Sequence, residues 1–233
     1  MNLIHILEGV SLSYPINLDI EGKVCIVLGG GHVAFRKITG LLNAGGKVIV
    51  IAPEICKEIK RLVENEQIEW RQQKYSSGCL PDGLILIAAT NDSEVNRLAT
   101  IEASSKNILV NLVNVKAQTS NAKTFTVPSV IRKNNLMLTI STEGLSPALS
   151  KYIRQYLETK FNDNFERWLE RLSKIREEVK ILINDAGTRE KFWRDVMSNE
   201  NFSLAQNGEI DKAEVNIRNA LDSYRSKPQN STD

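Results

Sequence analysis

The stretch that decides the fold of this chain is VCIVLGGGHVA, residues 24–34. Five apolar residues run into three consecutive glycines, and a helix-like pattern follows. A buried parallel strand that ends in a tight glycine turn and continues into a helix N-terminus forms a cradle for a phosphate group. Gly29 allows the turn, Gly31 allows a ligand to approach the backbone, and the small Ala34 lets the helix pack on the strand. The alternative is an ordinary glycine-rich turn that binds nothing.

The segments around this stretch alternate between strand and helix. Strands are expected at 24–28, 48–51, 68–74, 84–89 and 108–113, and helices at 33–43, 54–65 and 92–104. Continuous apolar strands rich in β-branched residues are typical of a parallel sheet that is covered on both faces. The pattern predicts an α/β fold with a Rossmann-like doubly wound parallel sheet.

The pattern changes after Val115. The expected elements there are strands at 125–127 and 136–141, a connector or short helix at 128–133, and helices at 147–160, 163–183, 188–198 and 209–225. Strands outside the alternating region are typical of a small sheet that a symmetric dimer uses. We therefore expect three parts: a nucleotide-binding Rossmann domain over 1–115, a strand-containing dimerisation region over 116–146, and a helical C-terminal domain over 147–233.

Composition narrows the class of protein. The 233 residues carry a net charge of +2, so no overall field points to nucleic acid or to a membrane surface. No apolar run reaches membrane-spanning length, and the N-terminus lacks the features of a signal peptide. The three cysteines are far apart and form no CxxC pair, so neither a metal site nor a disulfide framework is expected. A reducing cytoplasm fits this composition best.

The strand–turn–helix context of the three glycines, Gly29, Gly30 and Gly31, predicts a dinucleotide cofactor. A carboxylate at the end of the second strand of such a fold normally binds the adenosine ribose. Glu54 lies near that place but beyond Pro53, so it either reaches the ribose or charges the first turn of its helix. No basic residue stands at this strand end to meet a 2′-phosphate, which favours NAD over NADP.

Two other strand ends carry polar side chains. Thr90 and Asn91 follow the strand at 84–89, where the nicotinamide ribose would lie in a doubly wound sheet. Asn111 and Asn114 stand near the end of the next strand. For all four residues the alternative is a role in turns and helix caps that needs no ligand.

The passage ISTEGLSPA, residues 140–148, is a second glycine-bearing strand-to-helix connection. Its hydroxyl groups and the following helix N-terminus offer a place for a carboxylate, and the alternative is simple helix capping by Ser146 and Pro147. Basic residues flank it on both sides: Arg132, Lys133, Lys151, Arg154 and Lys160. These side chains either form a solvated face or bind a polycarboxylate.

These residues resemble the precorrin-2 dehydrogenase / sirohydrochlorin ferrochelatase family of siroheme synthesis, whose segments occur here in family order. Triple glycine followed by x-Val-Ala and Arg-Lys, and the run Ser-Pro-Ala-Leu-Ser, are more specific than a general Rossmann pattern. The matching segments are YPINLDIEGKVCIVLGGGHVAFRK (14–37), AGGKVIVIAPE (44–54), LILIAATND (84–92), NILVNLVN (107–114) and FTVPSVIRKNNLMLTISTEGLSPALSKYIR (125–154).

The resemblance implies NAD-dependent dehydrogenation of precorrin-2 to sirohydrochlorin by a homodimer, and some family members then insert Fe²⁺. The cofactor contacts of the family correspond to His32-Val33 and Pro53-Glu54. Precorrin-2 carries eight carboxylates, which gives the basic residues between 132 and 160 a role in binding.

The chain departs from the family pattern at the residues expected to be catalytic. Asn114 replaces an Asp that is the favoured general acid/base, and an amide cannot exchange a proton as a carboxylate does. Thr142 stands at the second hydroxyl position, and Glu143 replaces a glycine. We expect either that Glu143 partly substitutes for the lost Asp, or that hydride transfer needs no such base. The alternative function is a catalytically impaired tetrapyrrole-binding paralogue that retains NAD binding. An unrelated Rossmann oxidoreductase fits the segment after residue 125 less well.

Overall fold

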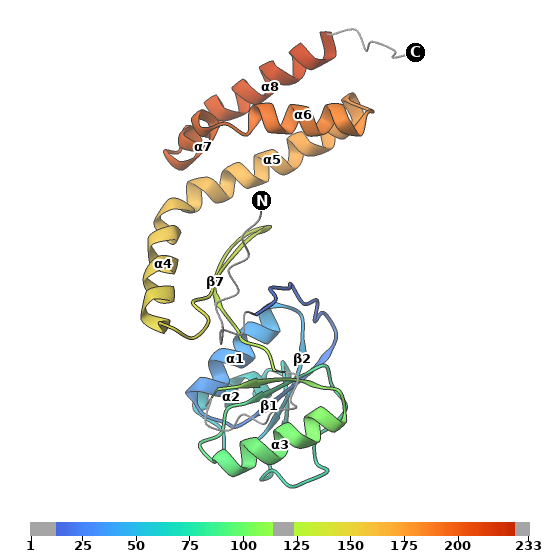
Figure 1. The fold of residues 1–233 in the computed structure, drawn as a ribbon, viewed down its shortest axis with the longest axis vertical. Helices are drawn as coiled ribbons and strands as arrows, with labels where there is room; N and C mark the ends of the chain where they lie inside the picture. The colour runs from blue at the N-terminus through green and yellow to red at the C-terminus, as the bar shows by residue number, and fades with distance from the viewer. Residues whose placement is uncertain (1–12, 114–123, 227–233) are drawn as a thin grey trace, which may run out of the picture. The chain divides into compact units, whose positions relative to one another are not determined.

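The computed structural model describes residues 13–113 and 124–226, and the chain divides into two compact units, residues 1–127 and 128–233 (Figure 1). Within the described ranges no helix is long and apolar enough to cross a membrane. The expected dimerisation region, 116–146, is split between the two units. The expected division into three domains stays a prediction.

The first unit is built on five parallel strands in the order β3-β2-β1-β4-β5. Their bounds are β1 (Val24–Leu28), β2 (Lys47–Ile51), β3 (Glu69–Arg71), β4 (Ile85–Ala88) and β5 (Leu109–Leu112). This order confirms the predicted Rossmann-like doubly wound sheet. The strand order reverses between β1 and β4, and ligands of such sheets bind in the crevice at the carboxyl ends of those two strands.

Helices cover both faces of this sheet: α1 (His32–Asn43), α2 (Lys57–Glu64) and α3 (Ser93–Ser105) (Figure 1). Successive side chains of a strand point to opposite faces. Cys25 and Val27 of β1 accordingly join the core under α1 and α2, while Ile26 and Leu28 join the core under α3. Two buried faces explain why the strands read as uninterrupted apolar runs.

Helix α2 begins three residues later than the sequence pattern predicts. The helix was expected from residue 54, with Pro53 near its start, but its N-cap is Cys56. The backbone N–H of Cys56 donates to the carbonyl oxygen of Gly30 at 2.8 Å. This hydrogen bond ties the segment between β2 and α2 to the glycine turn.

The second unit begins with an antiparallel hairpin of β6 (Ser129–Lys133) and β7 (Leu136–Ile140). The expected connector or short helix at 128–133 is therefore wrong, and residues 125–127 form no strand. Asn134 adopts a φ of +48° in the two-residue turn, a conformation that asparagine tolerates and that tight hairpins require. The Asn-Asn pair was the signal in the sequence for this hairpin.

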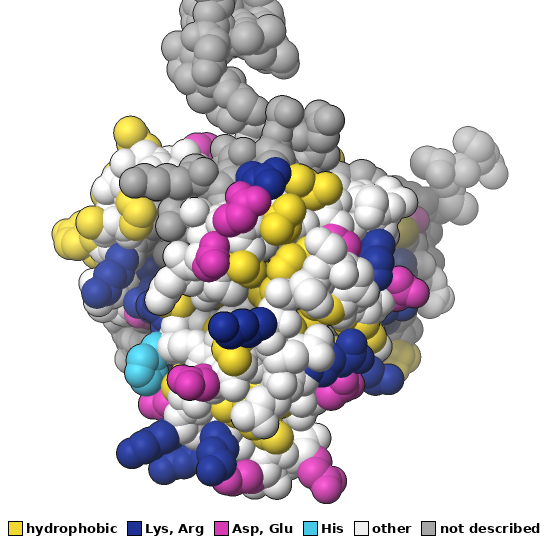
Figure 2. All heavy atoms as spheres, turned by 90° about the horizontal axis from the view of Figure 1, so that it is seen from below, with side chains coloured by type: hydrophobic (Ala, Val, Ile, Leu, Met, Phe, Trp, Pro, Cys, Tyr) yellow, Lys and Arg dark blue, Asp and Glu magenta, His cyan; other side chains and the backbone are white. Residues whose placement is uncertain are grey.

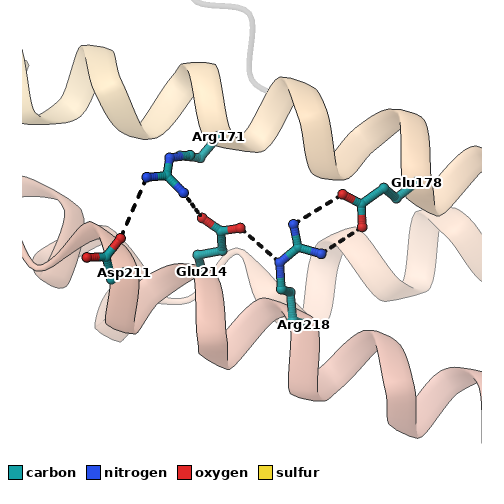
Figure 3. A network of polar contacts seen from close by, with 5 residues as sticks. All are labelled: Arg171, Glu178, Asp211, Glu214 and Arg218. Atoms are coloured by element: carbon teal, nitrogen blue, oxygen red, sulfur yellow. Dashed lines mark hydrogen bonds and ion pairs between the residues drawn. The ribbon is translucent and has the colours of Figure 1, made fainter.

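The described part of the second unit, which ends at residue 226, continues with five helices (Figure 1): α4 (Pro147–Lys160), α5 (Asp163–Leu182), α6 (Ala186–Val196), α7 (Asn199–Gln206) and α8 (Ile210–Ser226). The helices from α5 onward enclose an apolar core in which Phe165 and Phe202 pack edge to face with ring centroids 5.1 Å apart. Helix α7 was not expected, because its polar sequence shows little periodicity. A chain of ion pairs joins α5 to α8 along the surface of this bundle (Figure 3).

Candidate functional site

Gly29 brings the carboxyl ends of three strands together. Its φ is +118°, and its N–H donates to the carbonyl oxygen of Ile51 at 3.0 Å. A Cβ at this position would lie 2.6 Å from the carbonyl oxygen of Ala89. Glycine is therefore required here by the backbone conformation and by the close approach of the chain after β4.

Gly30 is required by a different neighbour. A Cβ there would lie 1.9 Å from the carbonyl oxygen of Glu54, a distance that no side chain tolerates. Together with the Cys56–Gly30 hydrogen bond, this contact fixes the segment after β2 against the glycine turn.

Gly31 is the N-cap of α1, and the protein gives no steric reason for a glycine there. Its φ of −87° and ψ of −176° are open to any residue, and nothing lies within 4 Å of the position of a Cβ. The reading of the motif as a ligand-free turn accounts for the two preceding glycines but not for this one. The open space lies at a helix N-terminus, whose first N–H groups have no partner within the helix and favour an anion.

The residues that follow the glycines divide into an exposed and a buried set. The His32 side chain is 79% exposed, and its Nδ1 lies 3.7 Å from a carboxylate oxygen of Glu58. Val33 is half-buried, and Ala34 is fully buried against the sheet as the sequence motif predicts. The structure thus brings His32 and Val33 to the start of α1 beside the glycine turn.

Pro53 and Glu54 are exposed beyond the end of β2. Because Glu54 lies two residues before the N-cap Cys56, it is not in the first turn of α2, and that interpretation of Glu54 is wrong. The contact of its backbone with Gly30 places it beside the glycine turn, where its role toward a ribose stays a prediction.

Thr90 has a structural role at the start of α3. Its Oγ1 accepts a hydrogen bond from the N–H of Asp92 at 3.2 Å and lies 2.8 Å from Oδ1 of Asn96. Asp92 is the N-cap, accepting hydrogen bonds from two N–H groups of the first turn. Asn91 is exposed. The capping explanation holds for Thr90, and a cofactor contact of either residue stays a prediction.

Asn111 lies in β5 and is buried. Its Nδ2 donates to the carbonyl oxygen of Phe125 at 2.8 Å, which holds the returning chain beside the sheet. Its Oδ1 is buried and has no partner among the described residues. Asn114 lies outside the described residues.

Thr142 organises the start of α4 in the second unit. Its Oγ1 accepts from the N–H of Ser146 at 3.2 Å and lies 3.1 Å from Oγ of Ser150. Ser146 caps the helix by accepting from the N–H of Leu149, and Pro147 is at N1, as predicted. Glu143 is exposed, with a φ of +49° in the preceding turn. A catalytic role of Thr142 or Glu143 stays a prediction.

Two of the basic side chains expected to bind a polycarboxylate are paired within the protein. Nζ of Lys133 lies 2.8 Å from Asp163, and Arg154 forms an ion pair with Glu158. Arg132 and Lys133 also line an open cavity of about 420 Å³ between β6, α4 and α5. Figure 2 shows a face of the first unit, on which basic and acidic side chains are interspersed, so no patch of one sign dominates that face.

The strand order and the glycine turn place the first unit in the class of Rossmann-type nucleotide-binding domains. Residues 16–129 match the family described as putative NAD(P)-binding, and residues 164–221 match the sirohaem synthase dimerisation region. The chain belongs to the family of siroheme synthase N-terminal regions.

Named relatives agree with this assignment. The chain is 32% identical over 208 residues to a siroheme synthase of Photorhabdus laumondii, covering 89% of this chain and 43% of the relative. It is 32% identical over 196 residues to a siroheme synthase of Chromobacterium violaceum, covering 84% and 41%. The chain thus spans less than half the length of these relatives. Among solved structures, SirC, a precorrin-2 dehydrogenase, shares the fold with a TM-score of 0.73 at 24% identity, covering 91% of this chain and all of that one.

Proposed function

We propose that this protein is an NAD-dependent dehydrogenase that oxidises precorrin-2 to sirohydrochlorin. The observation that carries the proposal is Gly31, a glycine that opens space at the N-terminus of α1 and that the fold itself does not need. The family supplies the substrate class, because its named relatives are siroheme synthases. The three cysteines are unpaired, which fits a protein that works in the reducing cytoplasm.

The first unit has the residues to hold the cofactor. Gly31 and the free N–H groups of the first turn of α1 would receive the diphosphate, with His32 and Val33 beside it. The carboxylate of Glu54 would accept hydrogen bonds from the adenosine ribose, and its negative charge would repel a 2′-phosphate. NAD⁺, when bound, supplies the hydride acceptor. Thr90 and Asn91 follow β4 at the strand-order reversal, where the nicotinamide end of the cofactor would lie.

The reaction would depend more on positioning than on a strong base. Asn114 cannot accept a proton as a carboxylate does, and the Thr142 hydroxyl is engaged at the start of α4. Orientation of substrate and cofactor can supply a large part of a rate enhancement, and oxidation here extends the conjugation of the macrocycle. Glu143 is the carboxylate best placed in the sequence to substitute for the Asp that the family has at position 114.

The test is NADH formation from anaerobically prepared precorrin-2 by the purified chain. We expect turnover by the wild type and its loss in a variant that does not bind NAD⁺. The Asn114→Asp variant separates the main proposal from its alternative. Activity that is already present and rises severalfold supports a working dehydrogenase, whereas activity that appears only in Asn114→Asp identifies an impaired paralogue that binds NAD⁺ and tetrapyrrole.

A further arm of the same assay supplies sirohydrochlorin and Fe²⁺. Metal insertion must remove the two pyrrole protons, which calls for a base more strongly than hydride transfer does. Because Asn114 cannot act as this base, we expect iron insertion to be no faster with the protein than without it.

We further propose that the protein acts as a homodimer. Four apolar side chains on and just before α4 are exposed at helical spacing: Leu145 (85%), Leu149 (44%), Tyr152 (67%) and Tyr156 (56%). Contiguous exposed apolar residues at this spacing are typical of a helix that packs on a partner. The match of the following helices to a family dimerisation region supports a second copy of this chain as that partner.

A further inference from the structure

We propose a binding site for a divalent transition-metal ion, formed by His32, Cys56 and Glu58 beside the glycine turn. One ligand atom from each residue lies within 4.8 Å of the other two. The proposal rests on this geometry and is independent of the proposed dehydrogenase function.

The three side chains come from two backbone segments that the fold holds together. His32 is the first residue of α1, Cys56 is the N-cap of α2, and Glu58 is in the first turn of α2. The hydrogen bond from Cys56 to Gly30, and the contact that only glycine allows at that position, lock these segments to each other. The backbone of the site is therefore preorganised, which reduces the entropy lost on binding.

The distances fit a small ion after modest side-chain rotation. Bonds of about 2.0–2.3 Å to a tetrahedral ion place neighbouring ligand atoms about 3.3–3.8 Å apart. Nδ1 of His32 and a carboxylate oxygen of Glu58 already lie 3.7 Å apart. The remaining separations are within 4.8 Å and need to shorten by at most about 1–1.5 Å. The 79% exposure of His32 leaves its ring room to turn.

The ligand chemistry selects the kind of ion. One imidazole, one thiolate and one carboxylate suit ions of borderline softness such as Zn²⁺ and Co²⁺ rather than Mg²⁺ or Ca²⁺. Three protein ligands leave a fourth position for water or another ligand.

The alternative is a solvent-exposed contact between His32 and Glu58 that contributes little to stability and binds no ion. Titration of the metal-free full chain with Co²⁺ distinguishes the two, because a thiolate bound to Co²⁺ gives a charge-transfer band in the near ultraviolet. We expect one equivalent of Co²⁺ to bind with this band. Cys56→Ser should abolish the band, and His32→Asn or Glu58→Gln should each weaken binding at least about tenfold.

Matched controls come from the same chain. Cys79→Ser changes another half-buried cysteine, His5→Asn changes the other histidine, and Glu64→Gln changes a carboxylate at the far end of α2. All three should bind Co²⁺ as the wild type does. The proposal is overturned if the wild type shows no thiolate band, or if Cys56→Ser binds Co²⁺ as tightly as the wild type.

A second measurement needs no variant. Zn²⁺ should slow alkylation of Cys56 at least about tenfold in the wild type and leave Cys79 unaffected, as read from the modified peptides by mass spectrometry. Equal protection of both cysteines, or protection of neither, contradicts the site. Neither experiment contains NAD⁺ or a tetrapyrrole, so failure of the metal site leaves the proposed reaction untouched.

Discussion

Gly29, Gly30 and Gly31 are adjacent in the sequence but serve three different purposes. The first has a backbone conformation that favours glycine, the second meets a carbonyl oxygen, and the third faces open space. The sequence motif predicts the turn and the close ligand approach. The tight contact of Gly30 with Glu54 depends on how the chain returns after β2, which no local pattern contains.

Substitution of Gly31 separates cofactor binding from folding. Gly31→Ala should leave the melting temperature unchanged, because the added methyl group meets no protein atom and the backbone is unstrained. It should weaken NAD⁺ binding at least about tenfold, equivalent to about 1.4 kcal/mol, by occupying the space of the phosphate. Isothermal titration calorimetry measures the NAD⁺ affinity of the wild type and that of Gly31→Ala.

Gly40→Ala is the matched control for this experiment. Gly40 lies inside α1, also with open space at the Cβ position. Alanine there should stabilise the protein by up to about 1 kcal/mol through its helix propensity and leave NAD⁺ affinity unchanged. Equal NAD⁺ affinity in Gly31→Ala and Gly40→Ala would remove Gly31 from the cofactor site.

Cys25 should be chemically silent in the folded protein. It is fully buried in β1, and burial raises the pKa of its thiol to about 11. The reactive thiolate therefore forms only as pH rises toward that value, and the side chain is inaccessible below it. At pH 8, iodoacetamide should modify the two half-buried cysteines before Cys25, with Cys25 reacting only after denaturation. Early modification of Cys25, seen by peptide mass spectrometry, would show that the β1 core opens.

At the scale of elements, the sequence predicts the strands and helices of the first unit to within a few residues. The signals are strong there, because both faces of each strand are buried and Asp92 is a recognisable N-cap residue. Ser146, followed by Pro147, gives the same kind of signal for α4 in the second unit. The errors fall where tertiary contacts decide. Helix α2 starts late because Cys56 bonds to the glycine turn, and β6 forms because Asn134 turns the chain back onto β7.

Glu102 of α3 holds the segment that leads into β4. Its carboxylate accepts hydrogen bonds from the Tyr75 hydroxyl at 2.8 Å and from the N–H groups of Gly78 and Leu80 at 3.0 Å each. Glu102→Ala leaves these donors without their acceptor and should lower the free energy of unfolding by about 2–4 kcal/mol. Chemical denaturation measures this loss, and Ser105→Ala at the end of α3 is the control. A loss below about 0.5 kcal/mol would mean that water replaces the carboxylate.

The ion pairs between α5 and α8 make the stability of the bundle pH-dependent (Figure 3). Arg218 forms a two-pronged pair with Glu178 at 2.7 and 3.1 Å, and its Nε donates to Glu214 at 2.8 Å. The hydrogen bonds from Arg218 lower the pKa of Glu178 below 4.5 in the folded state. The contribution of this ion pair to the stability of the folded protein is therefore fully present above pH 4.5. It is lost as the pH falls through the lowered pKa of Glu178.

Arg218→Ala should cost about 1–2 kcal/mol at neutral pH, a modest amount because the side chain is 41% exposed. The difference in melting temperature between Arg218→Ala and the wild type should shrink as the pH is lowered below 4.5. Lys180→Ala, which removes a pair within α5 alone, is the control. A difference that stays constant down to pH 3 would exclude the ion pairs as its cause.

At the scale of the whole molecule, the segments that resemble the family predict the NAD-binding unit. They also predict that the rest of the chain belongs to the same family. The sequence did not reveal the cluster of His32, Cys56 and Glu58, because its members are separated by up to 26 residues and meet only through the fold. It also did not predict that Lys133 of β6 is paired with Asp163 of α5, because that contact depends on how the hairpin meets the helix. The pair of Arg154 with Glu158 is different, because its i,i+4 spacing within α4 was present in the sequence and was missed.

A charge on the exposed apolar stripe should separate the proposed dimer into monomers. Tyr152→Glu places a carboxylate on the 67% exposed position of α4 and should shift the mass measured by light scattering from dimer to monomer, with an unchanged circular dichroism spectrum. Ile101→Glu, at a 47% exposed apolar position of α3 outside the segment that matches the dimerisation region, is the control and should remain dimeric. A wild type that is already monomeric would contradict the proposed dimer.

The reaction proposed for this chain is the transfer of a hydride from precorrin-2 to NAD⁺. The most direct measurement is an anaerobic single-turnover reaction that quantifies NADH and sirohydrochlorin together, with Gly31→Ala alongside the wild type. We expect equal amounts of the two products from the wild type and a reaction at least about tenfold slower from Gly31→Ala at limiting NAD⁺. Bound NAD⁺ and bound precorrin-2 without NADH formation would contradict the proposed reaction.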